Sequence, residues 1–570
     1  MIRNGWQRGT HLSSRSQRWI GPAAIVVAFL VLVMLIAPLR QFPMQDDWDY
    51  SKTVWNLLQT GVFHRSEVAQ ATVFFPAVWG SLFAKVLGYS FATLRVSTLV
   101  LASGALLLFY GLLAELGFDL PRRLLGTGAL MVAPTFVFLS SSFMTDVPFL
   151  FGYVGALACY VRAWRRDDRR FALLGSALAA VAFLSRQIGV LIPLAFGLFI
   201  IVQRWSWIQP QTAARRPLLR WLLAVGLLPA LVVGGYFIYT QFLGGGNWAD
   251  RARTLSGTLG FLLQPNALRV MGGRFVMTAA TIGIYLLPLW FALLGGRSTA
   301  GAGWEASPVW KKALLVLAAF GFAIVVIKLA MRPSWFPYLT DILTRRGLRP
   351  YLAYNAYDSG AHRPYLFSAQ VSAALTGLAA LLGLTLTLLA LGRLGTRPAP
   401  ELLLVYLTTA VLAMASLSFF SYYERYLLPL MPGAIVLLLD VSRRLRLSLR
   451  GGLLGFAVVA MVSVMLMRDY FAWNEVKWNA GRALLDRGVA VETIDGGMEW
   501  DGWYLYDRST AYIRDHGLEM TIAPWLDVLD PQYIFAFQPT PGYRVLQTLP
   551  FHTPLRPGGQ DQIYLLKRDP

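Results

Sequence analysis

The first 468 residues alternate between long apolar runs and short turns rich in arginine and lysine. About 20 helical residues cross the hydrocarbon core of a bilayer, so this pattern predicts about thirteen transmembrane helices. The runs lie at residues 20–39, 92–114, 124–144, 147–164, 171–203 (two helices), 218–242, 275–294, 313–331, 366–391, 402–421, 426–440 and 451–467. We therefore expect an α-helical polytopic membrane protein.

The run at residues 171–203 predicts a hairpin rather than one helix. As a single helix it would be about 50 Å long at 1.5 Å per residue, which exceeds a hydrocarbon core of about 30 Å. Both of its flanks are strongly basic, and basic flanks favour the same side of the membrane. We place the turn of this hairpin at Ser185-Arg186-Gln187.

Composition and charge indicate a membrane protein and argue against a nucleic acid partner. Hydrophobic residues make up 56% of the 570 residues and charged residues 14%, which is too apolar for a soluble chain of this length. The net charge is +21, but the arginines fall largely in short turns between apolar runs, so we expect no nucleic acid partner. The single cysteine, Cys159, rules out an intramolecular disulfide and a cysteine-based metal site.

The charge pattern also predicts the orientation. The segment before residue 20 is basic, so we expect the N-terminus to be cytoplasmic. We expect the protein to lie in the inner or plasma membrane, with membrane lipids around its helices. The first apolar run is long, and no small-x-small cleavage motif follows it, so we expect it to remain in the protein as a helix.

From residue 469 the sequence becomes soluble in character and mildly acidic. Residues 478–487 predict a helix, and residues 489–494, 533–537 and 562–566 predict strands. We therefore divide the chain into a transmembrane domain, residues 1–468, and a small extracytoplasmic α/β domain, residues 469–570.

Charged residues that could act in catalysis or ligand binding follow the odd-numbered spans. This position predicts that they lie together on the outer side of the membrane. In chain order they are Asp46, Asp47, Asp146, Arg186, Arg345, Arg346, Arg349, Glu424 and Arg425. The spans themselves are almost free of charge, with Lys328 as the clearest exception. A coupled transporter would be expected to carry ionisable groups at mid-membrane. Polar groups gathered at one membrane boundary instead suit chemistry on a lipid headgroup whose tail stays in the bilayer.

Several short motifs along the chain together resemble those of a known family. The motifs that carry the resemblance are Asp46-Asp47, Pro76, Leu87-Gly88-Tyr89-Ser90 with Leu94-Arg95, Thr145-Asp146-Val147-Pro148, Leu184-Ser185-Arg186-Gln187 and Glu424-Arg425-Tyr426-Leu427-Leu428-Pro429. Their order resembles the GT-C superfamily of lipid-carrier-dependent glycosyltransferases, in the branch of protein O-mannosyltransferases and the lipid A aminoarabinose transferase. The chain departs from relatives at Phe75, where these often have His or Lys before the interfacial proline.

The resemblance implies a GT-C-like fold and a reaction. Such an enzyme moves a sugar from a polyprenyl-phosphate donor to an acceptor hydroxyl on the extracytoplasmic face of the cell envelope, typically with inversion. The acceptor could be a lipid or glycolipid, a glycan or a protein. The alternative is a flippase or exporter of lipid-linked sugars, which would call for polar residues along several spans and an internal repeat; we see neither in the sequence.

An inverting transfer needs a general base, and a carboxylate can serve. We expect Asp46 or Asp47 to be the base, and the sequence favours neither over the other. Asp49 is interpreted as a carboxylate at the start of a helix. Asp146 is a further catalytic candidate, or an N-cap for the span that follows it. A divalent cation held by Asp47 and Asp146 is left open.

Arginine suits the departing phosphate because its planar fork of donors matches phosphate oxygens. We expect Arg186 and Arg425 to bind the donor phosphate, although Arg186 could also be an interfacial anchor. Glu424 would orient Arg425 or a metal, or pair with it on the surface. Arg345 and Arg346, with their neighbour Arg349, could close over the donor or lie in solvent.

Overall fold

The computed structural model is predominantly helical and agrees with the predicted fold class. It describes residues 16–204 except 67, 68 and 70; 215–242; 256–294; single residues between 316 and 327; 336–337, 342–349 and 352; 362–393; 396–419; 421–517; 531–555; and 560–569. Most of the predicted span at 313–331, with Lys328, lies outside these residues.

In the described part, eight helices are long and apolar enough to cross a membrane. They are α1 (Ser16–Ile36), α4 (Phe91–Glu115), α7 (Asp146–Arg166), α10 (Arg215–Phe242), α12 (Ala267–Tyr285), α15 (Ala369–Arg393), α16 (Pro400–Ser418) and α18 (Leu449–Asp486). A ninth span is formed if α5 (Leu120–Val132) and α6 (Pro134–Ser140), bent by 66°, are taken together. Pro134 lies at this bend, and proline restricts the residue before it.

The count of about thirteen full spans was too high for the described residues, because several apolar runs form short or broken helices. The predicted hairpin consists of α8 (Arg169–Ser185), the 3-10 turn η1 (Gln187–Val190) and α9 (Leu191–Gln203). Its break lies at Arg186, where the turn was predicted. The run at 275–294 is divided into α12 and α13 (Leu287–Leu294), and the run at 426–440 becomes the 3-10 helix η3 (Glu424–Leu430) and α17 (Met431–Val441).

Small residues allow some of these helices to approach closely. Gly383 of α15 packs against α12, where a Cβ would lie 2.5 Å from the backbone nitrogen of Ala280. Any larger residue at this point would force the two helices apart.

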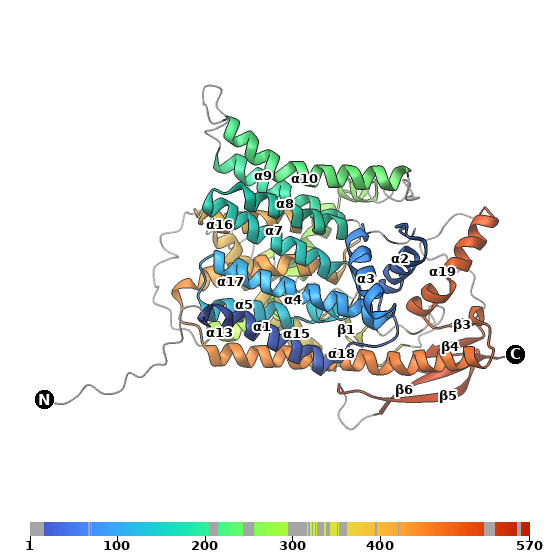
Figure 1. The fold of residues 1–570 in the computed structure, drawn as a ribbon. Helices are drawn as coiled ribbons and strands as arrows, with labels where there is room; N and C mark the ends of the chain where they lie inside the picture. Colours follow the sequence, from blue (N-terminus) through green and yellow to red (C-terminus); the bar gives the residue numbers. More distant parts are fainter. Residues whose placement is uncertain are drawn as a thin grey trace.

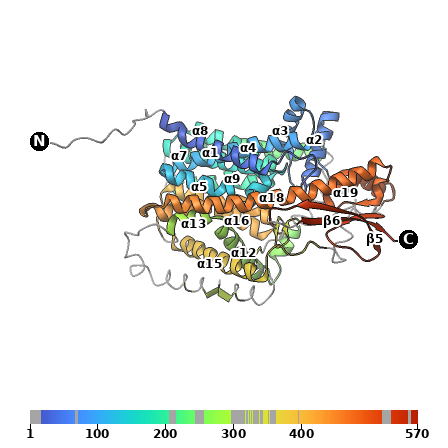
Figure 2. The ribbon, with the colours of Figure 1, turned by 90° about the horizontal axis from the view of Figure 1, so that it is seen from below.

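The C-terminal region differs in detail from the prediction. The predicted helix at 478–487 is the end of α18, which runs without a break through the predicted boundary at residue 468 and beyond the end of the bundle (Figure 2). A four-stranded sheet follows in the order β3 (Ile494–Asp495), β4 (Tyr533–Ala536), β6 (Gln560–Arg568), β5 (Tyr543–His552). β3 pairs parallel with β4, and the other pairs are antiparallel. The prediction missed β5 and helix α19 (Met498–Asp515).

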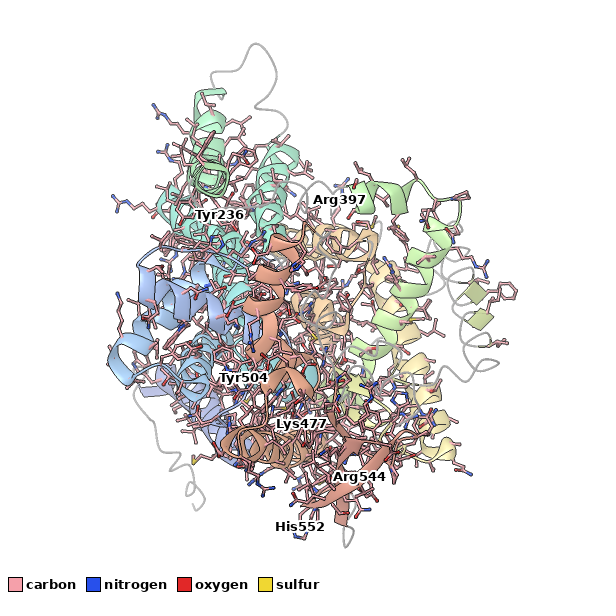
Figure 3. All side chains as sticks on the ribbon, turned by 90° about the vertical axis from the view of Figure 1, so that its right-hand side faces the viewer. Tyr236, Arg397, Lys477, Tyr504, Arg544 and His552 are labelled. Carbon is pink, nitrogen blue, oxygen red and sulfur yellow. The ribbon has the colours of Figure 1, made fainter. Side chains whose placement is uncertain are left out.

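The sheet and α19 lie at one end of the helix bundle, beside α2 (Asp47–Thr60) and α3 (Phe74–Leu87) (Figure 1). We call this the site end. Figure 3 looks at it directly, with Lys477 and Tyr504 near its middle and Arg544 and His552 at its lower edge. Each predicted site residue is described, so their mutual distances can be examined.

Candidate functional site

The loop after α1 is held in place by a buried arginine. Arg95 of α4 has no exposed surface and donates hydrogen bonds to the carbonyl oxygens of Pro38 (3.0 Å), Arg40 (2.8 Å) and Phe42. Hydrogen bonds from a charged donor are worth about 1.5–3 kcal/mol each. Arg95 therefore fixes the path of the chain just before the acidic stretch, a role that its position in the sequence did not reveal.

Asp47 is fully buried and accepts two backbone hydrogen bonds. Its Oδ1 accepts the N–H of Met44, and its Oδ2 accepts the N–H of Phe143 at 3.2 Å. Burial raises the pKa of Asp47 to about 7, against the charge of Arg95 and these two hydrogen bonds. The carboxyl of Asp47 thus joins the loop after α1 to the end of the third predicted span.

Asp46 is the more accessible of the two adjacent carboxylates. Its side chain is 27% exposed, and its Oδ2 lies 2.7 Å from Nη1 of Arg425. Burial raises the pKa of Asp46, but the charge and hydrogen bond of Arg425 lower it. The charges of Arg349 and Arg186 act in the same direction, and the net effect is a lowered pKa. Asp46 is therefore a carboxylate at neutral pH, paired with Arg425 and acted on by the charges of two further arginines.

A second carboxylate–arginine pair lies beside the first. Oδ1 of Asp146, at the N-terminus of α7, is 2.6 Å from Nη1 of Arg186. The guanidinium of Arg186 also lies over the ring of Tyr426, 5.4 Å from its centroid. Tyr426 directly follows Arg425, so one aromatic residue links the two pairs. The structure therefore brings together Asp46, Asp146, Arg186 and Arg425, as the sequence predicted.

Glu424 has a supporting position. It is 1% exposed, and its Oε1 accepts hydrogen bonds from Thr135 (3.0 Å) and from Tyr285. Its Oε2 accepts the N–H of Leu343 at 2.8 Å. Glu424 thus connects η3 to α6, α12 and the strand β1 (Leu343–Thr344), and we assign it to holding Arg425 in place.

The arginines of the loop after the ninth predicted span have different partners. Arg345 and Arg346 each lie over the ring of Tyr365, with 4.2 Å to its centroid. Arg349, just after the strand β2 (Gly347–Leu348), donates to Sδ of Met498 at 3.5 Å, and its charge acts on Asp46. The sequence singled out Arg345 and Arg346; the only signal for Arg349 was its place in the same basic loop.

The described residues hold no group of three or more His, Cys, Asp or Glu side chains that could bind a metal ion. The oxygens of Asp47 face two N–H donors, and Oδ1 of Asp146 faces a cation. A site formed by Asp47 and Asp146 together is therefore not favoured by the contacts of these residues.

The structure also has an apolar groove with a volume of about 600 Å³. It lies between α2, α3, α10 and the end of α8, and Phe63, Phe74, Leu184, Val232 and Tyr236 are among its lining residues. Leu184 is only two residues from Arg186. Tyr236 is labelled in Figure 3, where it lies among the helices above the α2–α3 region. The groove thus includes a residue at the end of the helix that precedes Arg186, and it is lined mainly by apolar side chains.

No protein-family model and no curated protein matches the sequence. Among solved structures, the chain is similar to ArnT from Cupriavidus metallidurans in the apo state, with a TM-score of 0.41 and 13% identity over 97% of this chain and 98% of that one. The same protein bound to undecaprenyl phosphate matches with a TM-score of 0.40 and 15% identity, over 84% of this chain and 74% of that chain.

Protein O-mannosyltransferase Pmt1-Pmt2 from S. cerevisiae matches with a TM-score of 0.33 and 14% identity, over 42% of this chain and 36% of that one. The present chain thus spans about a third of that relative. In fold, the chain is similar to these membrane proteins.

Proposed function

We propose that this membrane protein is a glycosyltransferase that moves a sugar from a polyprenyl-phosphate donor to an acceptor hydroxyl at the site end, with inversion. The observation that carries the proposal is the position of Asp46, a carboxylate that pairs with Arg425 and is also acted on by the charges of Arg349 and Arg186. Two carboxylates, Asp46 and Asp146, among these three arginines leave positive charge for an anionic ligand, and the apolar groove lined by Leu184 offers space for its hydrocarbon chain.

The arginines would bind the donor phosphate and stabilise it as it departs. Negative charge develops on the phosphate as the bond to the sugar breaks, and positioned cations lower the energy of that state. Arg425 and Arg186 each already hold a carboxylate through one Nη atom, at 2.7 and 2.6 Å. A guanidinium carries five N–H donors, so each can take a phosphate oxygen as well.

Asp46 would accept the proton of the acceptor hydroxyl. In this step the acceptor oxygen attacks the anomeric carbon, the bond from that carbon to the phosphate oxygen breaks, and polyprenyl phosphate leaves. While Arg425 pairs with Asp46, the pKa of Asp46 is lowered and its basicity is weak. A phosphate that draws Arg425 toward itself would raise the basicity of Asp46, so donor binding would prepare the base. Asp146 would hold the guanidinium of Arg186.

A transfer assay tests the proposal. Purified protein is incubated with a panel of labelled polyprenyl-phosphate sugars and lipid, glycan and peptide acceptors, and products are identified by mass spectrometry. Transfer of label to any acceptor, with release of polyprenyl phosphate, is the expected result. Proteoliposomes that move a lipid-linked sugar across the bilayer without breaking the sugar–phosphate bond would instead identify a flippase.

A further inference from the structure

The first turn of α19, in the C-terminal region, contacts the residue before Asp46 and also Arg349. Oε1 of Glu499 accepts the backbone N–H of Gln45 at 3.3 Å, and Gln45 directly precedes Asp46. The neighbouring Met498 accepts a hydrogen bond from Arg349 through Sδ, at 3.5 Å. Glu499 itself is 5% exposed. Two neighbouring residues of one helix thus contact the residue that precedes Asp46 and one of the arginines whose charge acts on Asp46.

Gln45 has a backbone conformation that needs support. Its φ is +54°, in the left-handed region, which costs a residue with a side chain about 1–2 kcal/mol relative to right-handed backbone. Its side chain is buried, so water does not solvate this turn freely. The 3.3 Å hydrogen bond from its N–H to Glu499 gives this buried donor an acceptor and so stabilises this conformation. Because φ of Gln45 sets the direction in which the chain enters α2, the bond also sets where Asp46 lies.

The position of α19 relative to α2 is fixed by further contacts. Gly502 faces Trp48, and a Cβ at Gly502 would lie 2.4 Å from the indole ring. The ring centroids of Trp48 and Tyr506 are 5.5 Å apart, and Nζ of Lys52 lies 2.6 Å from Oδ2 of Asp507. Gly502 and Tyr506 are four positions apart and so share one face of the helix, and Asp507 directly follows Tyr506. α19 is therefore held against α2 along two turns.

The start of α19 is also tied to the membrane helix α18. Lys477 of α18, which is fully buried, donates from Nζ to the carbonyl oxygen of Gly496 at 2.9 Å. The N–H of Gly496 donates to Asp501 at 3.2 Å, and that of Gly497 to Asp495 at 3.1 Å. Figure 3 shows Lys477 near the middle of the site end. These bonds make a continuous rigid connection from α18 through the turn to Glu499.

We propose that Glu499 is a positioning residue for the proposed transfer reaction: it holds Gln45 in its left-handed conformation and so sets the carboxylate of Asp46. This role rests on the function proposed above. It gives the C-terminal region a direct part in catalysis without placing any of its residues on the donor.

Three variants of the full-length protein test this role. Glu499→Ala removes the acceptor and leaves the N–H of Gln45 buried; we expect kcat to fall about 10- to 100-fold, the scale of a misplaced reacting group. The KM for donor should stay within about 2-fold, because Glu499 bonds to the backbone of Gln45 and not to the arginines proposed to bind the phosphate. Glu499→Gln keeps an acceptor oxygen and should retain most activity. In a Glu499→Ala background, Gln45→Asn should restore part of kcat, because asparagine adopts left-handed backbone more readily.

Hydrogen exchange measured by mass spectrometry tests the same role without turnover. In Glu499→Ala the backbone amides of residues 44–49 should exchange faster than in wild type, and in Glu499→Gln they should not. The matched control is Glu492→Ala, since Glu492 lies in the same region and pairs with Arg508, away from the first loop. Unchanged exchange in Glu499→Ala, or an equal loss of kcat in Glu499→Gln and Glu499→Ala, would overturn the positioning role. If the wild type transfers no sugar at all, the proposed function fails, and exchange alone decides whether Glu499 holds the loop.

Discussion

Replacing Arg425 by lysine separates charge from geometry at the proposed phosphate site. Arg425 lies 2.7 Å from Asp46 through one Nη, and its guanidinium is stacked 5.2 Å from the centroid of Tyr423. Lysine keeps the positive charge but loses the planar fork, so it cannot hold Asp46 and a phosphate oxygen in fixed directions at once.

The magnitude follows from the hydrogen bond that is lost. A hydrogen bond to a charged group contributes about 1.5–3 kcal/mol, which corresponds to about 10- to 150-fold in a dissociation constant. Because the lysine charge remains, we expect the lower part of this range. Arg425→Lys should therefore bind polyprenyl phosphate about 10- to 50-fold more weakly than wild type.

The assay is equilibrium binding of labelled polyprenyl phosphate to detergent-solubilised protein, which requires no sugar transfer. Arg443→Lys is the matched control. Arg443 pairs with Asp440 at 2.9 Å and lies 4.3 Å from the ring centroid of Phe118, so it resembles Arg425 in its contacts. It follows α17, whose eleven residues place it about 16 Å along the helix from η3. Equal affinity in Arg425→Lys and wild type would refute the assignment of this arginine to phosphate.

Three further predictions concern the second pair, pH and topology. Asp146→Asn and Arg186→Lys should each lower transfer at least about 10-fold, because the 2.6 Å charge pair is broken or reshaped, and full activity of both in the transfer assay would remove the pair from the site. Burial, with the charge of Asp46 adding to it, raises the pKa of Asp49 to about 7 from 3.8, so the folded protein holds a proton there that the unfolded chain has lost. Stability should therefore fall as pH rises from about 4 to 7, by at most about 4 kcal/mol from this group. Asp49→Asn should flatten that fall and raise the melting temperature at pH 8, measured by scanning fluorimetry; an unchanged profile contradicts the burial argument. In a cysteine-free background, His552→Cys should react with an impermeant thiol reagent on intact spheroplasts and Arg170→Cys only after lysis; the reverse would invert the predicted orientation.

The sequence predicted those features that depend on local pattern. The break at Arg186 followed from the length of an apolar run and its basic flanks, and the structure confirms it. Because these residues follow odd-numbered spans, the sequence predicted that Asp46, Asp146, Arg186 and Arg425 lie on one side of the membrane. In the structure they form two pairs. The choice of partner could not be predicted, because Asp46 and Arg425 are 379 positions apart and their contact depends on packing between helices.

Other features depended on burial, which the sequence pattern did not show. Asp46 and Asp47 are adjacent and chemically identical, yet one is partly exposed and the other has no exposed surface. Glu424 and Arg425 are neighbours in a polar turn, so nothing in the sequence indicated that their burial would differ. Glu424 is buried and accepts hydrogen bonds from three residues of distant elements. α19 was missed because its first turns mix tryptophan, glycine and acidic residues, and its stability comes from packing against α2 rather than from helix propensity.

The measurement that tests the account most directly is the rate of sugar transfer by Asp46→Asn, made beside donor binding by the same variant. Asparagine keeps the size of the side chain but cannot accept a proton at neutral pH. General-base catalysis contributes about 10²- to 10⁴-fold, so the rate should fall on that scale, while polyprenyl phosphate still binds with at least wild-type affinity because Arg425 loses a competing carboxylate. Asp47→Asn serves as the comparison and should act mainly by lowering the melting temperature, since the Asp47 carboxyl accepts two backbone hydrogen bonds. Transfer by Asp46→Asn at close to the wild-type rate would contradict the account.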